Sequence, residues 1–80
     1  MKRRHPGKIH NYTRQIQGCH YFLSPAEGSH KIYMTADRDG VNCQDCILLK
    51  DEAGTAQYHI EAIEHYGDSP TLWTALLVRR

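Results

Sequence analysis

Two cysteines, Cys43 and Cys46, constrain this chain more than any other feature. They stand between the turn residues Asp39-Gly40 and an apolar run that begins at Ile47. A C-x-x-C turn lets two sulfur atoms converge on one metal ion, and it also occurs as a redox pair. A redox pair of the thioredoxin kind follows a buried strand in a βαβ unit, and no such unit is visible here. The pattern therefore favours half of a metal site over a redox pair or plain buried thiols.

The length of the chain also favours a metal. Its 80 residues make one domain with a marginal core, because a chain of this size buries only about 60% of its unfolded surface. Three cysteines are an odd number, whereas a secreted disulfide scaffold usually holds an even one, so we expect reduced thiols and a cytoplasmic protein. One structural Zn²⁺ per chain would contribute about 10 kcal/mol to folding, and its removal by a chelator should abolish cooperative unfolding.

The other two ligands of such a site must come from upstream residues. Cys19 supplies a third thiolate. His10 is the preferred fourth ligand, because two neighbouring strands would bring His10 and Cys19 to one end of a meander. His20 points to the opposite face of a strand from Cys19, but it remains an alternative, as does His30. The predicted closed Cys3His site consists of His10, Cys19, Cys43 and Cys46.

The first half of the chain predicts strands. Short runs rich in aromatic and β-branched residues at 8–12, 18–23 and 30–36 indicate a three-stranded antiparallel meander. In the third run apolar and polar side chains alternate, which is typical of a half-buried strand. The basic residues 1–7 contain the breaker pair Pro6-Gly7 and are expected to form a flexible arm. Residues 8–80 then form a single zinc-binding domain.

The second half predicts helices. Residues 47–49 would continue from the cysteine turn as a short helix. Within 55–66, apolar side chains recur at three- and four-residue spacing, as on the buried face of an amphipathic helix: Ala56, His59, Ile60, Ile63 and Tyr66. Ser69-Pro70 favours a last helix over 71–78, with an edge strand as the alternative. The expected fold class is α+β, a small zinc-stabilised domain with a meander, a C-x-x-C knuckle and one or two covering helices.

The region from His10 to Leu49 resembles a group of small phage-encoded zinc-binding proteins. The resemblance rests on His10, Cys19, Thr35-x-Asp37 and Val41-x-Cys43-x-x-Cys46, and it covers about half of the chain. It implies a structural zinc and a phage or prophage origin, with a bacterial cytoplasm as the setting. The group shares no activity that could be transferred to this chain.

Two functions compete, and neither is enzymatic, because no H-E-x-x-H motif is present and four ligands would close the metal site. The first is a small accessory protein, monomer or homodimer, that binds and modulates a host protein. Its expected contact residues are Leu72, Trp73 and Leu76. No apolar run is long enough to span a membrane.

The alternative function is nucleic-acid binding. Basic residues with no intervening acid occupy the start of the chain, and they would contact phosphates: Lys2, Arg3, Arg4, Lys8 and Arg14. Aromatic residues on or near the strands would stack on bases or belong to the core: Tyr12, Tyr21, Phe22 and Tyr33. From Asp45 to Asp68 the balance reverses, with six acids against Lys50, so the two ends of the chain should attract different partners, or each other.

Overall fold

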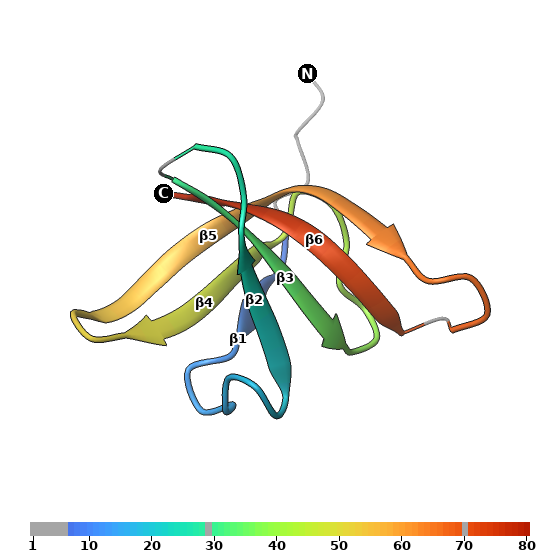
Figure 1. Ribbon diagram of the computed structural model, residues 1–80, viewed down its shortest axis with the longest axis horizontal. Coiled ribbons are helices and arrows are strands. Elements are labelled where there is room, and N and C mark those ends of the chain that lie inside the picture. The colour runs from blue at the N-terminus through green and yellow to red at the C-terminus, as the bar shows by residue number, and fades with distance from the viewer. Residues whose placement is uncertain (1–6, 29, 70) are drawn as a thin grey trace, which may run out of the picture.

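The computed structural model describes residues 7–28, 30–69 and 71–80, which form one six-stranded mixed sheet (Figure 1). In chain order the strands are β1 (Ile9–Asn11), β2 (Tyr21–Pro25), β3 (Lys31–Asp37), β4 (Cys46–Asp51), β5 (Gly54–His65) and β6 (Leu72–Arg79). Their order across the sheet is β1-β4-β5-β6-β3-β2, so the first two strands are its two edges. β1 runs parallel to β4, and every other neighbouring pair is antiparallel.

The α+β prediction is wrong, because the described residues contain no helix. The segments 47–49, 55–66 and 71–78 were predicted to be helical, but 47–49, 55–65 and 72–78 lie in β4, β5 and β6. β6 is a central strand between β5 and β3 rather than an edge strand. The predicted meander is also wrong, because β1 pairs with β4, so that of the three strands predicted for it only β2 and β3 are neighbours. No helix that could cross a membrane occurs in the part of the chain that the structure describes.

A β-bulge explains why β5 has a helix-like sequence. Ala56, Tyr58 and Ile60 occupy alternate positions that face the core, and the register against β6 shifts between Ile60 and Ala62. Glu61 is the extra residue of the bulge. Because of it, the next side chain after Ile60 that faces the core is that of Ile63 and not that of Ala62. The apolar spacing therefore changes from two to three within one strand, which imitates the period of a helix.

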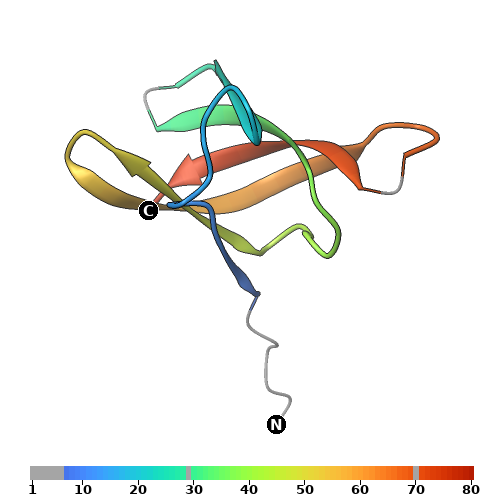
Figure 2. The same ribbon diagram turned by 90° about the horizontal axis from the view of Figure 1, so that it is seen from below.

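The core lies on the concave side of the curved sheet (Figure 2). Its largest completely buried side chains come from four different strands: Met34, Ile47, Ile60, Trp73 and Leu77. The Trp73 indole N–H donates to the Arg38 carbonyl at 3.0 Å. All these side chains alternate along their strands with positions that face outward, so one face of the sheet is dry and the other is open to solvent.

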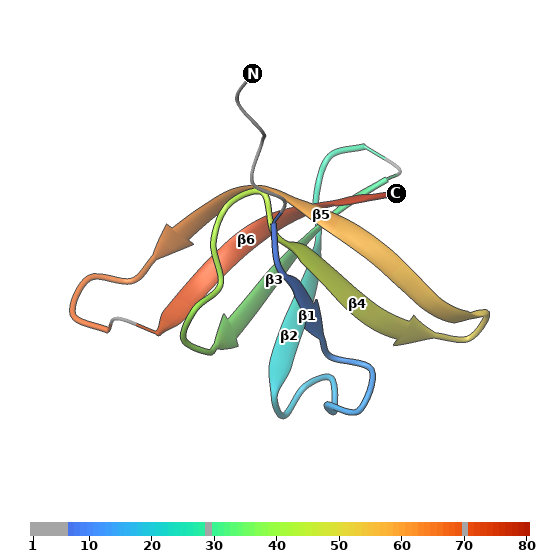
Figure 3. The same cartoon turned by 180° about the vertical axis from the view of Figure 1, so that it is seen from behind.

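Residues 12–20 connect the two edges of the sheet (Figure 3). Tyr12 follows β1, and its backbone N–H donates to the Leu48 carbonyl at 2.9 Å. Tyr21 opens β2, and the rings of Tyr12 and Tyr21 meet edge to face with centroids 5.6 Å apart. The guanidinium of Arg38 lies 5.0 Å from the centroid of the Tyr12 ring. Because both tyrosines are almost completely buried, this contact joins the edges and closes the core between them.

Candidate functional site

The predicted zinc ligands do not converge. Cys19 and Cys43 are exposed, Cys46 is half-buried, and all three thiols are free. The Cys43 thiol donates to the Glu61 carbonyl at 3.3 Å, and the Cys46 sulfur accepts from the Gln57 amide at 3.4 Å. Within residues 7–28, 30–69 and 71–80, no group of three or more His, Cys, Asp or Glu side chains is placed to hold a metal. The structure therefore does not support a closed site built from these four residues.

The fourth predicted ligand, His10, has another partner. Its Nε2 atom lies 2.8 Å from Oδ2 of Asp45, and both side chains are at most 10% exposed. His20 and His30, the alternatives to His10 as the fourth ligand, belong to other segments than the cysteine turn. His20 accepts the Ile16 backbone N–H at its Nδ1, within the connection between β1 and β2, and His30 is exposed before β3. The His10 side chain thus serves the fold through Asp45.

Asp45 is the only buried acidic or basic residue in the described part of the chain. Besides His10, its carboxylate accepts the backbone N–H groups of Lys8 and Asn42, each at 3.0 Å. Burial alone raises the pKa of this carboxyl, but the hydrogen bonds from His10, Asn42 and Lys8 outweigh burial and hold the pKa below its usual value. The carboxylate therefore joins β1 to the cysteine turn, across 37 residues of sequence from Lys8.

The start of the described chain packs closely on the same turn. A methyl group at Gly7 would lie 2.2 Å from the Gln44 carbonyl oxygen, a distance that no side chain tolerates. The Cys46 N–H donates to the Lys8 carbonyl at 2.8 Å, and Gln44 itself has a positive φ of 79°. The segment Asn42–Cys46 is consequently a structural anchor for β1.

The residues predicted to contact nucleic acid or a partner are dispersed. Lys2, Arg3 and Arg4 lie outside the described residues, and Lys8 and Arg14 are exposed. Trp73 is completely buried and cannot contact a partner in the folded protein. Leu72 and Leu76 are half-buried on the convex face of β6.

The convex face of the sheet is the best candidate for a binding site. We call the outward side chains of β2, β3, β6 and the second half of β5 the outer face. Phe22 and Tyr33, on β2 and β3, are 55% and 42% exposed there. Thr35 and Thr74 face each other across β3 and β6 with their hydroxyls 2.9 Å apart, and the Tyr66 hydroxyl lies 2.8 Å from that of Thr74. Three aromatic rings thus surround a small polar centre.

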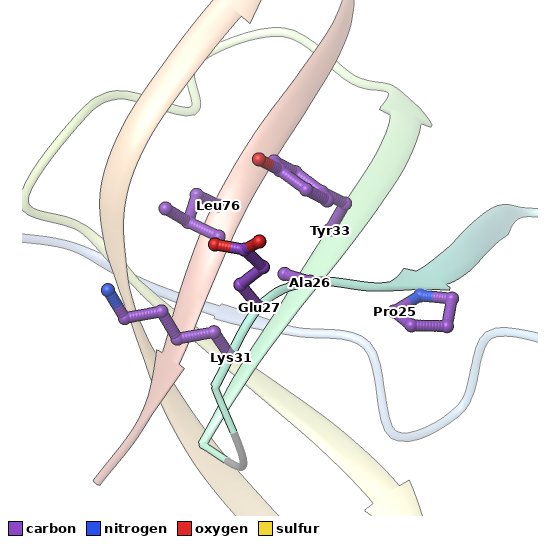
Figure 4. A pocket seen from close by; sticks show the side chains of 6 residues that line it. All are labelled: Pro25, Ala26, Glu27, Lys31, Tyr33 and Leu76. Atoms are coloured by element: carbon purple, nitrogen blue, oxygen red, sulfur yellow. The ribbon is translucent and has the colours of Figure 1, made fainter.

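Two grooves flank Tyr33 and Leu76 on the outer face. The first has a volume of about 530 Å³ and is completed by Pro25, Ala26, Glu27 and Lys31 (Figure 4). The second, of about 390 Å³, is completed by Ala62, Ile63, Glu64 and Thr74. Tyr33 and Leu76 are opposite each other in the β3–β6 register and line both grooves, so they form a ridge between them.

Carboxylates surround this ridge. Glu27 lines the first groove, where its carboxylate extends toward Leu76 (Figure 4). Glu64 lines the second groove, and Glu61 pairs with Lys31 at 3.4 Å. Lys31 and Glu61 are 40% and 50% exposed, so this pair is screened by water and contributes little to stability. Three acids against one base make the rim of the Tyr33–Leu76 ridge acidic.

Comparisons with protein-family models, with curated proteins and with solved structures give no significant match.

Sequence reasoning missed two parts of this arrangement. Asp45 lies between the two cysteines of the C-x-x-C turn, and no local pattern distinguishes a buried carboxylate from a surface one. The four aromatic residues considered as a stacking surface separate, since Tyr12 and Tyr21 belong to the core and Phe22 and Tyr33 to the outer face. Alternation in a correctly placed β6 would have assigned Leu76 to the same face as Tyr33.

Proposed function

We propose that this protein is a small binding module that recognises a partner protein through its outer face. The observation that carries the proposal is the ridge of the exposed Tyr33 and the half-buried Leu76 between two grooves, with the exposed Phe22 on the same face. Exposed aromatic side chains grouped on one face favour a protein interface, because they bury a large area at a small cost in conformational entropy. In the bacterial setting that the resemblance implies, the partner would be a host protein.

The charges of the outer face favour a protein over a nucleic acid. Base stacking on Phe22 and Tyr33 would bring the phosphate backbone close to Glu27, Glu61 and Glu64, with Lys31 as the only cation in this group. Affinity for nucleic acids comes mainly from cations that contact phosphates. An apolar surface with an acidic rim instead complements a protein surface that carries Lys or Arg around an apolar centre.

Photocrosslinking tests the proposal. A benzophenone amino acid placed at Tyr33 should form a nuclease-resistant adduct with one protein in a bacterial lysate. That protein, once identified and purified, should bind the unmodified chain with an affinity that Tyr33→Ser and Phe22→Ser each reduce. The matched control is Ile16→Ser, because Ile16 is 61% exposed but lies in the connection between β1 and β2. Equal loss of affinity in all three variants, or an adduct that contains nucleic acid, would contradict the proposal.

A further inference from the structure

The second half of β5 has one unpaired edge. β4 pairs with β5 only as far as His59, and Ile60 exchanges backbone hydrogen bonds with Gln44 and Asp45 at 3.1 and 2.9 Å. Beyond Ile60, β5 pairs with β6 on its other side up to His65. Among the described residues, no backbone group pairs with 61–65 on the side away from β6. In Figure 1 this half of β5 extends past β4 together with β6.

The alternation of backbone groups identifies which hydrogen-bonding groups are free. The Tyr66 N–H donates to the Leu72 carbonyl across to β6 at 3.0 Å. Backbone groups of successive residues in a strand point to opposite sides, so Ala62 and Glu64 also face β6. Ile63 and His65 therefore direct their N–H and C=O groups toward the open side. An added strand that bonds to both residues would have its central residue opposite Glu64.

Charge excludes a second copy of this chain from that position. Two copies that both used Ile63 and His65 in antiparallel pairing would place Glu64 directly opposite the same residue of the other copy. Like charges that face each other across a strand pair are destabilising. Glu64 thus protects the edge from self-association, which is one way natural sheets manage an exposed edge.

The same charge favours a strand with Lys or Arg at its centre. We propose that the Ile63–His65 edge receives an extended cationic segment of the partner protein as a seventh strand. This proposal rests on the proposed function, in which the outer face binds the partner. The central cation of this segment pairs with Glu64. An apolar side chain two residues away lies beside Ala62, where the second groove begins, with Tyr33 and Leu76 on its far wall. Backbone pairing supplies affinity, and these two contacts supply specificity.

A peptide of defined sequence tests the pairing. The probe is the capped peptide acetyl-Thr-Lys-Val-Lys-Val-Leu-Thr-amide, titrated into the full ¹⁵N-labelled chain; in antiparallel pairing its central Lys lies opposite Glu64 and its Leu beside Ala62. Amide signals of residues 61–66 should shift, and hydrogen exchange should slow at the Ile63 and His65 amides. N-methylation of both valines removes the donors for the Ile63 and His65 carbonyls and leaves every side chain in place. This methylated peptide should bind at least roughly tenfold more weakly than the probe, because two hydrogen bonds are lost.

Charge reversal provides the second arm. Glu64→Lys should weaken binding of the Lys peptide and permit binding of the same peptide with Glu in place of Lys. The proposal is overturned if the methylated peptide binds as well as the probe, or if the shifts avoid 61–66. It is also overturned if the edge amides become protected with increasing protein concentration alone, since that indicates a second copy. Partner binding that depends on Tyr33 would survive each of these results, so the two proposals fail separately.

Discussion

Replacement of Asp45 by asparagine should destabilise the fold far more than its position in a surface turn suggests. The carboxylate accepts three hydrogen bonds, and an amide oxygen in the place of Oδ2 can keep those from His10 and Asn42. The amide NH₂ group then faces the Lys8 N–H, which loses its acceptor. An unpaired N–H costs about 1–3 kcal/mol, and loss of charge assistance costs about 1 kcal/mol for each of the two retained bonds, so we expect a total of at least about 3 kcal/mol.

Urea unfolding measures this difference directly. Trp73 is the single tryptophan and is completely buried, so its fluorescence reports the unfolding of the whole sheet. In a chain of this length a loss of about 3 kcal/mol corresponds to a decrease in Tm of about 15 °C. The matched control is Asp39→Asn, because Asp39 is an exposed acid in the same loop. Its free energy of unfolding should equal that of the unaltered protein.

The loss of stability in Asp45→Asn should depend on pH, and the lowered pKa of Asp45 determines the direction. The folded protein holds the pKa of Asp45 below the unfolded value of about 3.9, so the folded state favours the ionised form. Its contribution to stability is complete above that unfolded value and is lost as the pH falls through the folded-state pKa. The difference in free energy of unfolding between the unaltered protein and Asp45→Asn should therefore be largest near neutral pH and decrease below about pH 4. A gap that is absent at pH 7, or that stays constant down to pH 2, would refute this account of Asp45.

Three further predictions test the fold. Gly7→Ala should lower the free energy of unfolding by about 1–3 kcal/mol, because its methyl group meets the Gln44 carbonyl, whereas Gly67→Ala, with no atom within 4 Å of the new carbon, should change it little. Deletion of Glu61 removes the bulge and keeps every side chain of β5 on its face, so an NMR spectrum should show a folded protein. Deletion of Gln57 moves the neighbouring side chains to the wrong face, so the spectrum should be that of an unfolded chain. Chelation of metals should leave the thermal transition unchanged, because the core of the described residues is closed without converging metal ligands. This outcome is the opposite of the one expected from the cysteine pattern, and a large fall in Tm would support the zinc hypothesis instead.

The three strands predicted in the first half of the chain overlap β1, β2 and β3, and the one with a regular period was placed most accurately. The run 30–36 alternates over its whole length and is β3 with a shift of one residue. The error in β5 has a single cause, because one inserted residue at Glu61 converts an alternating pattern into a helix-like one. The sequence of β6 did not distinguish a strand from a helix, because apolar residues occur on both of its faces. Leu72 and Leu76 are half-buried on the outer face, and they obscure the alternation of the buried Trp73, Ala75 and Leu77.

The candidate site could not be predicted because it depends on non-local pairing. Tyr33 and Leu76 are 43 positions apart in the sequence and become neighbours only through the β3–β6 register. The spacing of the cysteine turn suits a metal, but it gives no sign that residues of the same turn bind β1. Local patterns report the period of an element well, whereas the pairing of edges and faces is decided by the whole sheet.

The position of β6 also determines the order of folding. β6 joins the two halves of the sheet, since β4 and β5 lie on one side of it and β3 and β2 on the other. Before β6 is made, the β2–β3 and β4–β5 hairpins exist as separate two-stranded pieces, which are at best marginally stable in water. Both the Tyr33–Leu76 ridge and the core around Trp73 arise in the same late step. During synthesis the chain should therefore acquire the Tyr33–Leu76 ridge and its stability together.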